Sequence, residues 1–412
     1  MISTDGRGEN GRNQFHAIER TIMAKTITRR EVLKTGLTAA SLAAMGLPEW
    51  TLPGLAQGET VVPFTDIPDT VSFTLDPKSG TRVLDIRTVT EPFTAKDQFY
   101  CVQHLGQPEI DSSTYRLKIT GAVEKPAELS LENIRNRSPL RLAAGFECSG
   151  NSPRRIQGLA SNGMWTGIRL RDLLSGIGVR PEGKEVVFFG ADHGEAEVPF
   201  RGQTFKVEQQ FGRSMSLENA LRPEPLLAYA LNGDPLTRQQ GAPMRLIVPG
   251  WYGVANVKWL SQIHIQRERF VGNYQARWYL SLKSETVNGQ EIWKETEVTR
   301  MQLKSVIARV TRSGNRHQVH GFVLNDGTPL KTVEVQADNG PWEAATLDPS
   351  NAQYSWKLFT YIWEGATPGE HTLVSRATDV NGNVQPTVAE LGMRKKTFLE
   401  DNAQFPRKVM IS

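Results

Sequence analysis

Residues 143–155 read Ala-Ala-Gly-Phe-Glu-Cys-Ser-Gly-Asn-Ser-Pro-Arg-Arg and place one cysteine, Cys148, between an apolar stretch and two arginines. A thiolate is a soft ligand that selects soft or high-valent transition metals over magnesium or calcium. Gly150 lets the backbone approach a bulky ligand, and Arg154 and Arg155 can hold an anion. The pattern fits a metal site beside an anion site, and it fits equally well a buried structural cysteine at a turn.

The length and charge of the chain favour a two-domain protein that acts on small molecules. With 412 residues it is too long for one ordinary core, so we expect two domains behind a leader. Its 48 Lys and Arg nearly balance 44 Asp and Glu, for a net charge of +4. The charges lack the clustered basic footprint of a nucleic-acid-binding protein, so no nucleic-acid partner is expected.

The chain has two cysteines, Cys101 and Cys148. In an exported protein they could form a disulfide, which a metal-bound Cys148 would exclude. There is no Cys-x-x-Cys-His sequence for attaching a c-type haem, so we expect no haem in this chain. Electrons from any redox reaction must then leave through another protein.

Residues 1–56 resemble an export leader. Thr-Arg-Arg-Glu-Val-Leu-Lys at 28–34 precedes a mildly apolar run at 35–47, which is shorter than the about 20 residues that cross a bilayer. A basic pair before such a run is typical of a twin-arginine signal, with cleavage expected after Ala56 and Met23 as an alternative start. This predicts a periplasmic protein exported in its folded state. No other long apolar segment is present, so stable membrane insertion is not expected.

The first part of the mature chain indicates an α+β domain, because short helices and strands alternate without a regular βαβ pattern. Residues 57–95 read as an extended arm that wraps the first domain, and 163–167 read as a turn. Strands are expected at 97–104, 115–121, 185–190, 245–250 and 257–260, and short helices at 130–134, 168–178 and 214–221.

Three polar residues in this part have both an ordinary and a functional interpretation. Taken alone, His104 is more simply an ordinary hydrogen-bonded histidine, and Lys258 a lysine whose amine reaches solvent. Arg245 begins a buried strand, and together with Lys258 and the glycine-rich loop between them it could bind a phosphate.

From about residue 300 the pattern becomes all-β. Short strands separated by Asn-Asp-Gly and Thr-Pro-Gly turns over about 110 residues indicate an immunoglobulin-like β-sandwich, in which the many aromatic residues are core packing. The expected strands are 305–312, 317–324, 333–337, 354–363 and 372–377.

Together these segments resemble the sulfite oxidase family of molybdopterin enzymes. The resemblance covers the chain from about residue 95 to its end. It implies a central mixed α/β molybdopterin-binding domain at 96–295 and an immunoglobulin-like dimerisation domain at 296–412, and hence a homodimer. The shared segments are Phe-Glu-Cys-Ser-Gly-Asn at 146–151, Trp-Thr-Gly at 165–167 with the helix at 168–178, 226–233, Pro-Met-Arg-Leu-Ile-Val-Pro-Gly at 243–250, Val-Lys-Trp-Leu at 257–260, and Ala-Thr-Asp-Val-Asn-Gly-Asn-Val-Gln-Pro at 377–386.

The resemblance also implies the site residues. Cys148 would be the protein ligand to molybdenum, beside the dithiolene sulfurs of the pterin and oxo groups. Metal binding deprotonates such a thiol. The residues expected to contact the pterin or its phosphate are Gln103, His104, Asp192, Gln240, Arg245, Asn256, Val257 and Lys258.

The chain departs from the family pattern in front of the metal. Val102 stands where sulfite oxidases have an arginine that helps to bind sulfite, and Phe211 stands in the place of an active-site tyrosine. Gln240 replaces a cofactor-contacting histidine, and Ser152 and Pro153 separate the arginine pair from the cysteine motif. These changes argue against a small dianion such as sulfite as the substrate.

The expected function is that of an exported mononuclear molybdenum oxidoreductase. It would move an oxygen atom between water and a small anionic substrate, sulfite or a sulfur compound of the kind handled by the sulfane dehydrogenase branch. Two electrons would pass to an external acceptor such as a c-type cytochrome. We expect Arg154 and Arg155 to orient the anion over Cys148, with Asp192 and His193 nearby. An S-oxide reductase and a metal-free exported binding protein are the alternatives.

Overall fold

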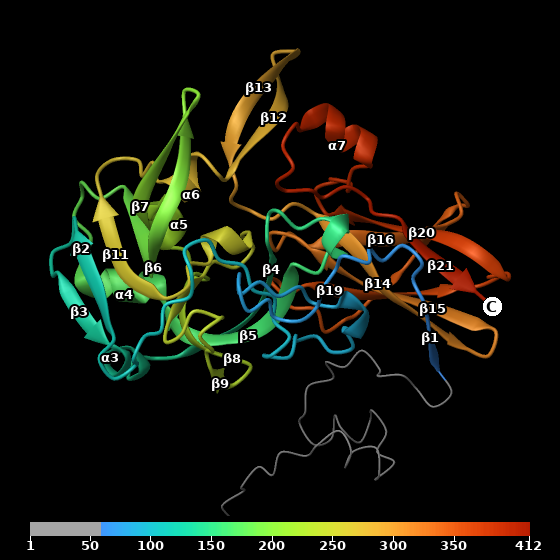
Figure 1. The fold of residues 1–412 in the computed structure, drawn as a ribbon, viewed down its shortest axis with the longest axis horizontal. Coiled ribbons are helices and arrows are strands. Elements are labelled where there is room, and N and C mark those ends of the chain that lie inside the picture. The colour runs from blue at the N-terminus through green and yellow to red at the C-terminus, as the bar shows by residue number, and fades with distance from the viewer. Residues whose placement is uncertain (1–58) are drawn as a thin grey trace, which may run out of the picture. The chain divides into compact units, whose positions relative to one another are not determined.

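The computed structural model describes residues 59–412, so the expected export signal at 1–56 lies outside the described residues. The described part is an α+β fold made mostly of strands with a few short helices (Figure 1). None of its helices is long and apolar enough to span a bilayer.

Two sheets share the core of the first part of the chain. Both contribute buried side chains to one continuous hydrophobic cluster. The first sheet has the order β3-β2-β11-β6-β7, made of β2 (Arg116–Gly121), β3 (Ala127–Ser130), β6 (Glu185–Phe200), β7 (Gln203–Ser216) and β11 (Leu260–Gln266). The second has the order β10-β8-β5-β4, made of β4 (Leu140–Glu147), β5 (Ala160–Arg169), β8 (Leu226–Leu231) and β10 (Arg245–Ile247), with β9 (Asp234–Pro235) beside β8.

Short helices close this core where the sequence predicts them. In α4 (Leu170–Ile177) the apolar residues recur at helical spacing and are buried, and the helix ends at Gly178, whose φ of 79° only glycine adopts readily. Ser130 and Asn133 form a capping box on α3 (Leu131–Arg135). The remaining helices of this part are α5 (Leu217–Ala220) and α6 (Asn273–Ala276).

The C-terminal part is a β-sandwich, in which all five predicted strands form. Its two sheets have the orders β1-β14-β15-β19-β18 and β17-β16-β20-β21, and their inner faces meet in one hydrophobic cluster. The strands are β14 (Lys304–Ser313), β15 (Arg316–Leu324), β16 (Leu330–Ala337), β17 (Trp342–Ala344), β18 (Thr346–Leu347), β19 (Lys357–Trp363), β20 (Gly369–Asp379) and β21 (Arg407–Ile411).

The N-terminal arm joins both parts of the fold, whereas the sequence suggested that it wraps the first part alone. Its strand β1 (Thr60–Val62) pairs with β14 of the sandwich, and Thr65 donates its backbone N–H to Lys408. Further along, Leu84 donates to Gly158 and Arg82 bridges to Cys101 in the first part.

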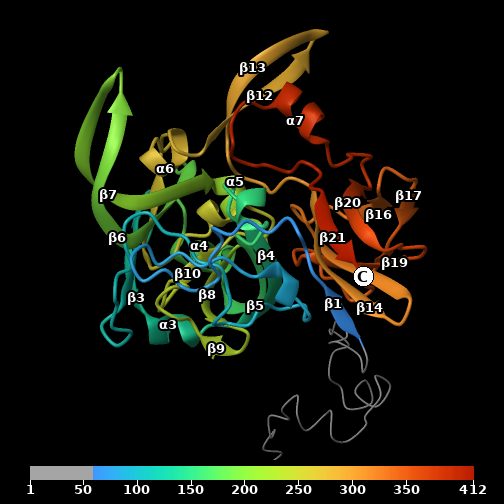
Figure 2. The ribbon, with the colours of Figure 1, turned by 45° about the vertical axis from the view of Figure 1, so that its right-hand side comes forward.

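Two further elements project beyond the core on the same side. The hairpin of β12 (Leu280–Val287) and β13 (Gln290–Glu297) lies beside α7 (Val388–Arg394) in both views (Figures 1 and 2). Lys396 donates its backbone N–H to Leu282 at 3.0 Å, which fixes the chain after α7 against this hairpin.

The predicted turn at 163–167 is wrong, because these residues lie inside β5. Their two glycines permit close packing in place of a reversal of the chain. A Cβ on Gly167 would lie 2.0 Å from the carbonyl oxygen of Leu227, and one on Gly163 would lie 2.3 Å from the Leu231 side chain.

Three other local predictions also need correction. Residues 214–216 continue β7, and the helix begins only after Ser216, whose side chain caps it. Residues 97–104 form no strand beyond the bridge at Cys101. Lys258 lies in a loop, because Trp259 has a φ of +48°, which interrupts an extended strand before β11 begins.

Candidate functional site

Cys148 is the first residue after β4, at the edge of a pocket. Its backbone N–H donates to Leu159 at 2.9 Å. Asn151 secures the same loop: its amide group donates to Glu147 at 3.0 Å, and its oxygen accepts from the Leu159 N–H at 3.0 Å. The cysteine is therefore held on a rigid support while its side chain stays partly exposed.

Seven of the predicted site residues line this pocket, which holds about 650 Å³ of free space, part of it open to solvent. They come from four separate stretches of sequence that the two sheets bring together. These residues are Gln103, His104, Cys148, Asp192, Arg245, Asn256 and Lys258.

Gln240 and Val257 lie behind the pocket and do not line it. The Gln240 carbonyl accepts from Arg245 at 3.0 Å, and its side chain donates to the Lys96 carbonyl at 2.8 Å. The Val257 carbonyl accepts from Leu246 at 2.8 Å. Both residues hold the loops that carry the two cations.

The structure does not bring Arg154 and Arg155 into the pocket. They lie on a 3-10 turn and are exposed, because the next residue, Ile156, turns inward with a φ of 48° and is buried. Both arginines line a different groove together with residues of 70–83. His193 is exposed as well, so only Asp192 of that pair faces the pocket.

Arg245 and Lys258 place two cations in the pocket without an ion pair among the described residues. Arg245 donates to the carbonyls of Gln240 and Asn256, and its Nε has no partner. Lys258 donates to the Gln103 side chain and the Gln239 carbonyl, both at 3.2 Å. Burial lowers the pKa of Lys258 to about 8 and that of Arg245 to about 10. Buried cations without a counter-charge are costly, so the site is suited to an anion such as a phosphate.

Asp192 offers an acceptor to the same pocket. Its Oδ1 is buried without a hydrogen-bond partner, and burial raises the pKa of its carboxyl group to about 6. An unpartnered buried acceptor is costly unless a ligand N–H fills it.

Tyr279 is a pocket residue that sequence reasoning missed. Its hydroxyl lies 2.6 Å from Nε2 of His104, whose ring stacks on Tyr274 with 4.8 Å between centroids. Phe211 brings no hydroxyl to the pocket, whereas Tyr279 lines the same pocket with a phenol. The aromatic cluster of Tyr274, Trp278 and Tyr279 in the sequence was the available signal.

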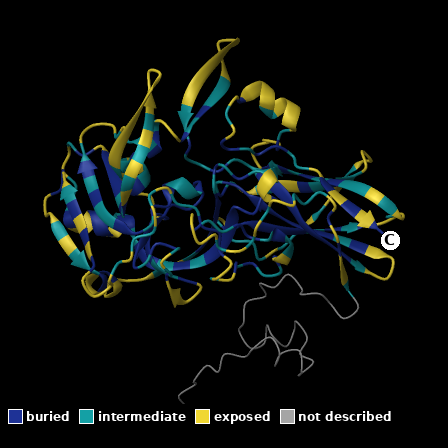
Figure 3. Ribbon diagram, in the orientation of Figure 1, coloured by how far each residue is buried: buried dark blue, intermediate teal, exposed yellow. Residues whose placement is uncertain are grey.

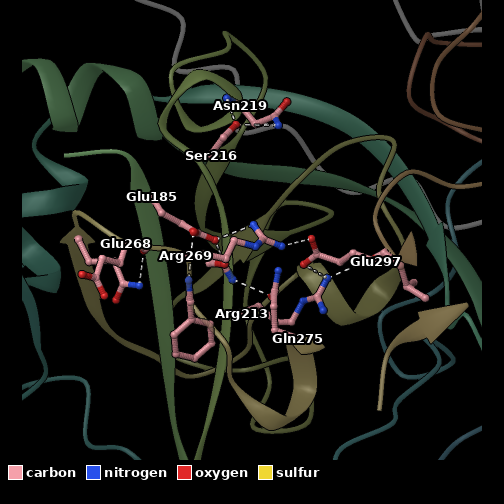
Figure 4. Close-up of polar contacts among 12 residues, drawn as sticks. Glu185, Arg213, Ser216, Asn219, Glu268, Arg269, Gln275 and Glu297 are labelled. Carbon is pink, nitrogen blue, oxygen red and sulfur yellow. Dashed lines mark hydrogen bonds and ion pairs between the residues drawn. The ribbon is translucent and has the colours of Figure 1, made fainter. Parts of the chain in front are cut away.

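A polar network that includes the buried Arg213 and Glu185 holds the segment that carries these aromatic residues, and Figure 4 shows its side chains. Arg213 of β7 donates to the carbonyls of Tyr274 and Val298, both at 2.7 Å. Arg269 bridges Glu185 on β6 and Glu297 on β13. The network ties the segment that carries Tyr274 and Tyr279 to the strands at the pocket edge.

The environment of His104 predicts a pH-dependent stability. Burial of the ring and the nearby Lys258 lower the pKa of His104 to about 4. Because the folded pKa lies below the unfolded value, stability is lost as the pH falls from about 6.5 to about 4. The residue as a whole is exposed, so solvent screening reduces the effect to about 1 kcal/mol. Urea unfolding at pH 7 and pH 4.5 should show a smaller loss in His104→Gln than in the wild type; equal losses would exclude this contribution.

The residues of the pocket fit a molybdopterin cofactor. The thiol of Cys148 is a soft metal ligand, and burial raises its pKa, so it would lose its proton on binding a metal. No three His, Cys, Asp or Glu side chains converge within residues 59–412, so further ligands would come with the cofactor. Arg245 and Lys258 suit its phosphate, and Asp192 suits an N–H of its ring. Cys101 and Cys148 are both free thiols, which removes the disulfide alternative for the described fold.

Comparisons with known proteins agree with this assignment. Residues 104–274 match the model of the oxidoreductase molybdopterin binding domain. The mitochondrial sulfite oxidase of Drosophila melanogaster is 29% identical over 332 residues, which are 71% of this chain and 55% of that protein. The mitochondrial sulfite oxidase of Homo sapiens is 29% identical over 327 residues, 71% of this chain and 57% of that protein. The chain thus spans little more than half the length of these relatives.

The fold resembles the sulfane dehydrogenase SoxCD from Paracoccus pantotrophus. The TM-score is 0.68 at 23% identity, over 92% of this chain and 99% of the other. The pocket, the matched domain model and the similar sequences point to the same group of proteins. The chain therefore contains an oxidoreductase molybdopterin binding domain at residues 104–274, and its sequence is similar to those of sulfite oxidases.

Proposed function

We propose that the protein is an exported molybdenum oxidoreductase that oxidises sulfite or a related sulfur compound and passes electrons to an external c-type cytochrome. The observation that carries the proposal is the pocket that joins the Cys148 thiol to the unpaired cations Arg245 and Lys258. A sulfur lone pair forms a bond to an oxygen derived from water, and both O–H bonds of that water break. Two protons go to solvent, and two electrons leave for the acceptor.

The pocket residues would have different roles according to where they lie. Arg245 and Lys258 would bind the phosphate of the cofactor, and Asp192 would accept a hydrogen bond from its ring. When bound, the cofactor supplies a metal that exchanges two electrons and an oxygen atom. The phenol of Tyr279 is held by a neutral His104 and can orient a substrate oxygen or a water molecule in front of Cys148.

The pocket wall favours a substrate with less charge than the sulfite dianion. Val102 and Phe211 line it, whereas Arg154 and Arg155 face elsewhere. We propose a sulfur compound of the sulfane type as the better substrate and sulfite as a poorer one. The reverse reaction, reduction of an S-oxide, stays the second candidate.

Metal analysis and a substrate panel test the function together. Protein from a host that makes the cofactor should contain about one molybdenum per chain and oxidise sulfur compounds with ferricyanide as acceptor. A preparation with far less metal and no turnover would favour the alternative of a metal-free binding protein. Turnover of S-oxides alone would favour the reductase.

Val102→Arg tests the missing anion contact. A charge-assisted hydrogen bond contributes about 1.5–3 kcal/mol, so the KM for sulfite should fall about tenfold or more. Val102→Gln, which adds a polar side chain without charge, is the matched control and should change the KM little. A KM that falls equally in both variants would contradict the role of charge.

We further propose a homodimer formed through the β-sandwich and a periplasmic location. Sedimentation of the purified protein, and fractionation of cells with and without Arg29 and Arg30 replaced by lysine, test these two points. Both are independent of the catalytic proposal.

A further inference from the structure

An exposed apolar segment lies between strands β20 and β21 of the sandwich and includes α7. No residue of α7 is buried, and all of its residues except Leu391 are exposed (Figure 3). Val388, Met393 and Phe398 are 67%, 62% and 79% exposed, which is unusual for side chains of this size. Val388 and Phe398 line one hollow beside α7, and exposed apolar residues that share a surface mark interaction sites on soluble proteins. We call residues 387–398 the strap.

The strap adjoins the Cys148 loop on its outer side. Glu400, just after the strap, donates its backbone N–H to the Ser149 carbonyl at 2.7 Å. A Cβ on Gly150 would lie 3.7 Å from the ring of Phe398 and 3.9 Å from Sγ of Cys148. The most exposed large apolar side chain and the thiol are therefore separated by little more than one glycine.

A buried ion pair keeps this junction in place. The Glu400 side chain is 1% exposed and pairs with Lys283 of β12 at 2.6 Å. Lys395, whose ammonium group donates to the carbonyls of Thr397 and Leu399, shapes the turn that presents Phe398. The ring is thus exposed on a fixed support.

Cations outnumber carboxylates around the strap, although Asp401 also lines the hollow beside it. Arg394 and Lys396 are exposed on it, and exposed Arg154 lines the hollow that α7 and Phe398 border. The one carboxylate of the strap, Glu390, is engaged in capping the Thr387 N–H and hydroxyl. An apolar centre with a cationic rim complements a partner face that is apolar and bordered by carboxylates.

We propose that the strap is the docking site for an electron-accepting protein of this kind, an acidic c-type cytochrome, with Phe398 at the centre of the contact. The inference rests on the proposed function, since it supplies the exit for the two electrons. They leave one at a time past Gly150 and Phe398, and each reduces one ferric haem to the ferrous state. No bond of the chain is made or broken.

The test is direct binding of an acidic c-type cytochrome to the full protein. An aromatic residue at the centre of an interface contributes enough that Phe398→Ser should weaken the Kd at least tenfold. Phe205→Ser is the matched control, since Phe205 is 46% exposed on the β6–β7 hairpin and should change the Kd less than twofold. The double variant Arg394→Glu, Lys396→Glu should also weaken binding, and the loss of affinity should be larger at low salt than at high salt.

Kinetics with two acceptors complete the test. Phe398→Ser should raise the KM for the cytochrome and leave turnover with ferricyanide unchanged. Failure of the wild type with ferricyanide would overturn the proposed function, whereas the binding comparison remains decisive for the docking site. Unchanged cytochrome binding in Phe398→Ser overturns the proposal. If that variant also changes from dimer to monomer, the strap is a contact between two copies of the chain.

Discussion

Replacement of Cys148 by serine is expected to abolish oxidation of the sulfur substrate. Loss of a partner that only supports a metal ligand already costs 10–100-fold in activity, so loss of the ligand itself should cost more than about 100-fold. A serine hydroxyl is a harder donor with a much higher pKa than a thiol, and it supplies less electron density to the metal. The loss should therefore appear in kcat.

The fold and the pterin should remain in this variant. The loop is held by the Cys148 backbone N–H and by the side chain of Asn151, neither of which changes. Arg245 and Lys258 still offer their charges to the phosphate. We expect pterin fluorescence of the denatured protein at wild-type level, with loss of the absorption bands that arise from the Cys148 sulfur.

Cys101→Ser is the control for this experiment. Cys101 lines the same pocket, but its Sγ contacts the Phe99 carbonyl at 3.5 Å. This variant should keep the absorption bands and most of the turnover. Wild-type kcat in Cys148→Ser would refute the ligand assignment.

Replacement of Lys304 by methionine should lower the free energy of unfolding by about 3–5 kcal/mol. Lys304 on β14 and Glu147 at the end of β4 form an ion pair at 3.1 Å, with side chains 1% and 2% exposed. The variant leaves the Glu147 carboxylate buried with only Asn151 as a partner. The pair also joins the sandwich to the residue before Cys148, so the cysteine loop should loosen.

A double-mutant cycle separates the interaction energy of the ion pair from the cost of leaving one of its charges buried without a partner. Glu147→Leu with Lys304→Met removes both charges and should recover most of the lost stability, since an apolar pair of similar volume often replaces a buried ion pair without loss. Denaturant unfolding of the four proteins is the measurement. Additive effects of the two single changes would argue against a direct interaction.

The stability of Lys304→Met should depend on pH because the carboxyl group of Glu147 remains in the core. Burial raises the pKa of Glu147, and removal of the lysine raises it further. Because the folded pKa then lies above the unfolded value of about 4.3, the folded state binds more protons, and stability falls as the pH rises from there. The variant should therefore be closest to the wild type at pH 5 and furthest from it at pH 8.

The sequence predicted elements of the fold correctly where residue type and backbone pattern indicate the same element. Cys148 follows a strand directly and Arg245 begins one, but these patterns alone left both residues with ordinary interpretations, and the resemblance to the sulfite oxidase family predicted that they share a site. The sandwich strands alternate clearly between turn residues, and all five were found. The apolar spacing of α4 placed that helix to within a few residues.

The errors arose where tertiary contacts override local signals. The arginines at 154 and 155 adjoin Cys148 in the chain, yet one 3-10 turn directs them outward. Gly163 and Gly167 resemble a turn but permit close strand packing. Tyr279 and His104 are far apart in the chain, and Arg213 holds the segment before Tyr279 from another strand, so no local pattern encodes their contact.

The pairing of β1 with β14 also constrains the order of folding. Thr60 lies opposite Arg312, and Phe64 bridges to Val409. During synthesis the first strand must wait until almost the whole chain has emerged before it finds its neighbours, and such distant pairings form late. The N-terminal strand therefore takes its place only after the rest of the fold has formed. Deletion of β21 should expose the beginning of the chain to proteolysis before it disturbs the pocket.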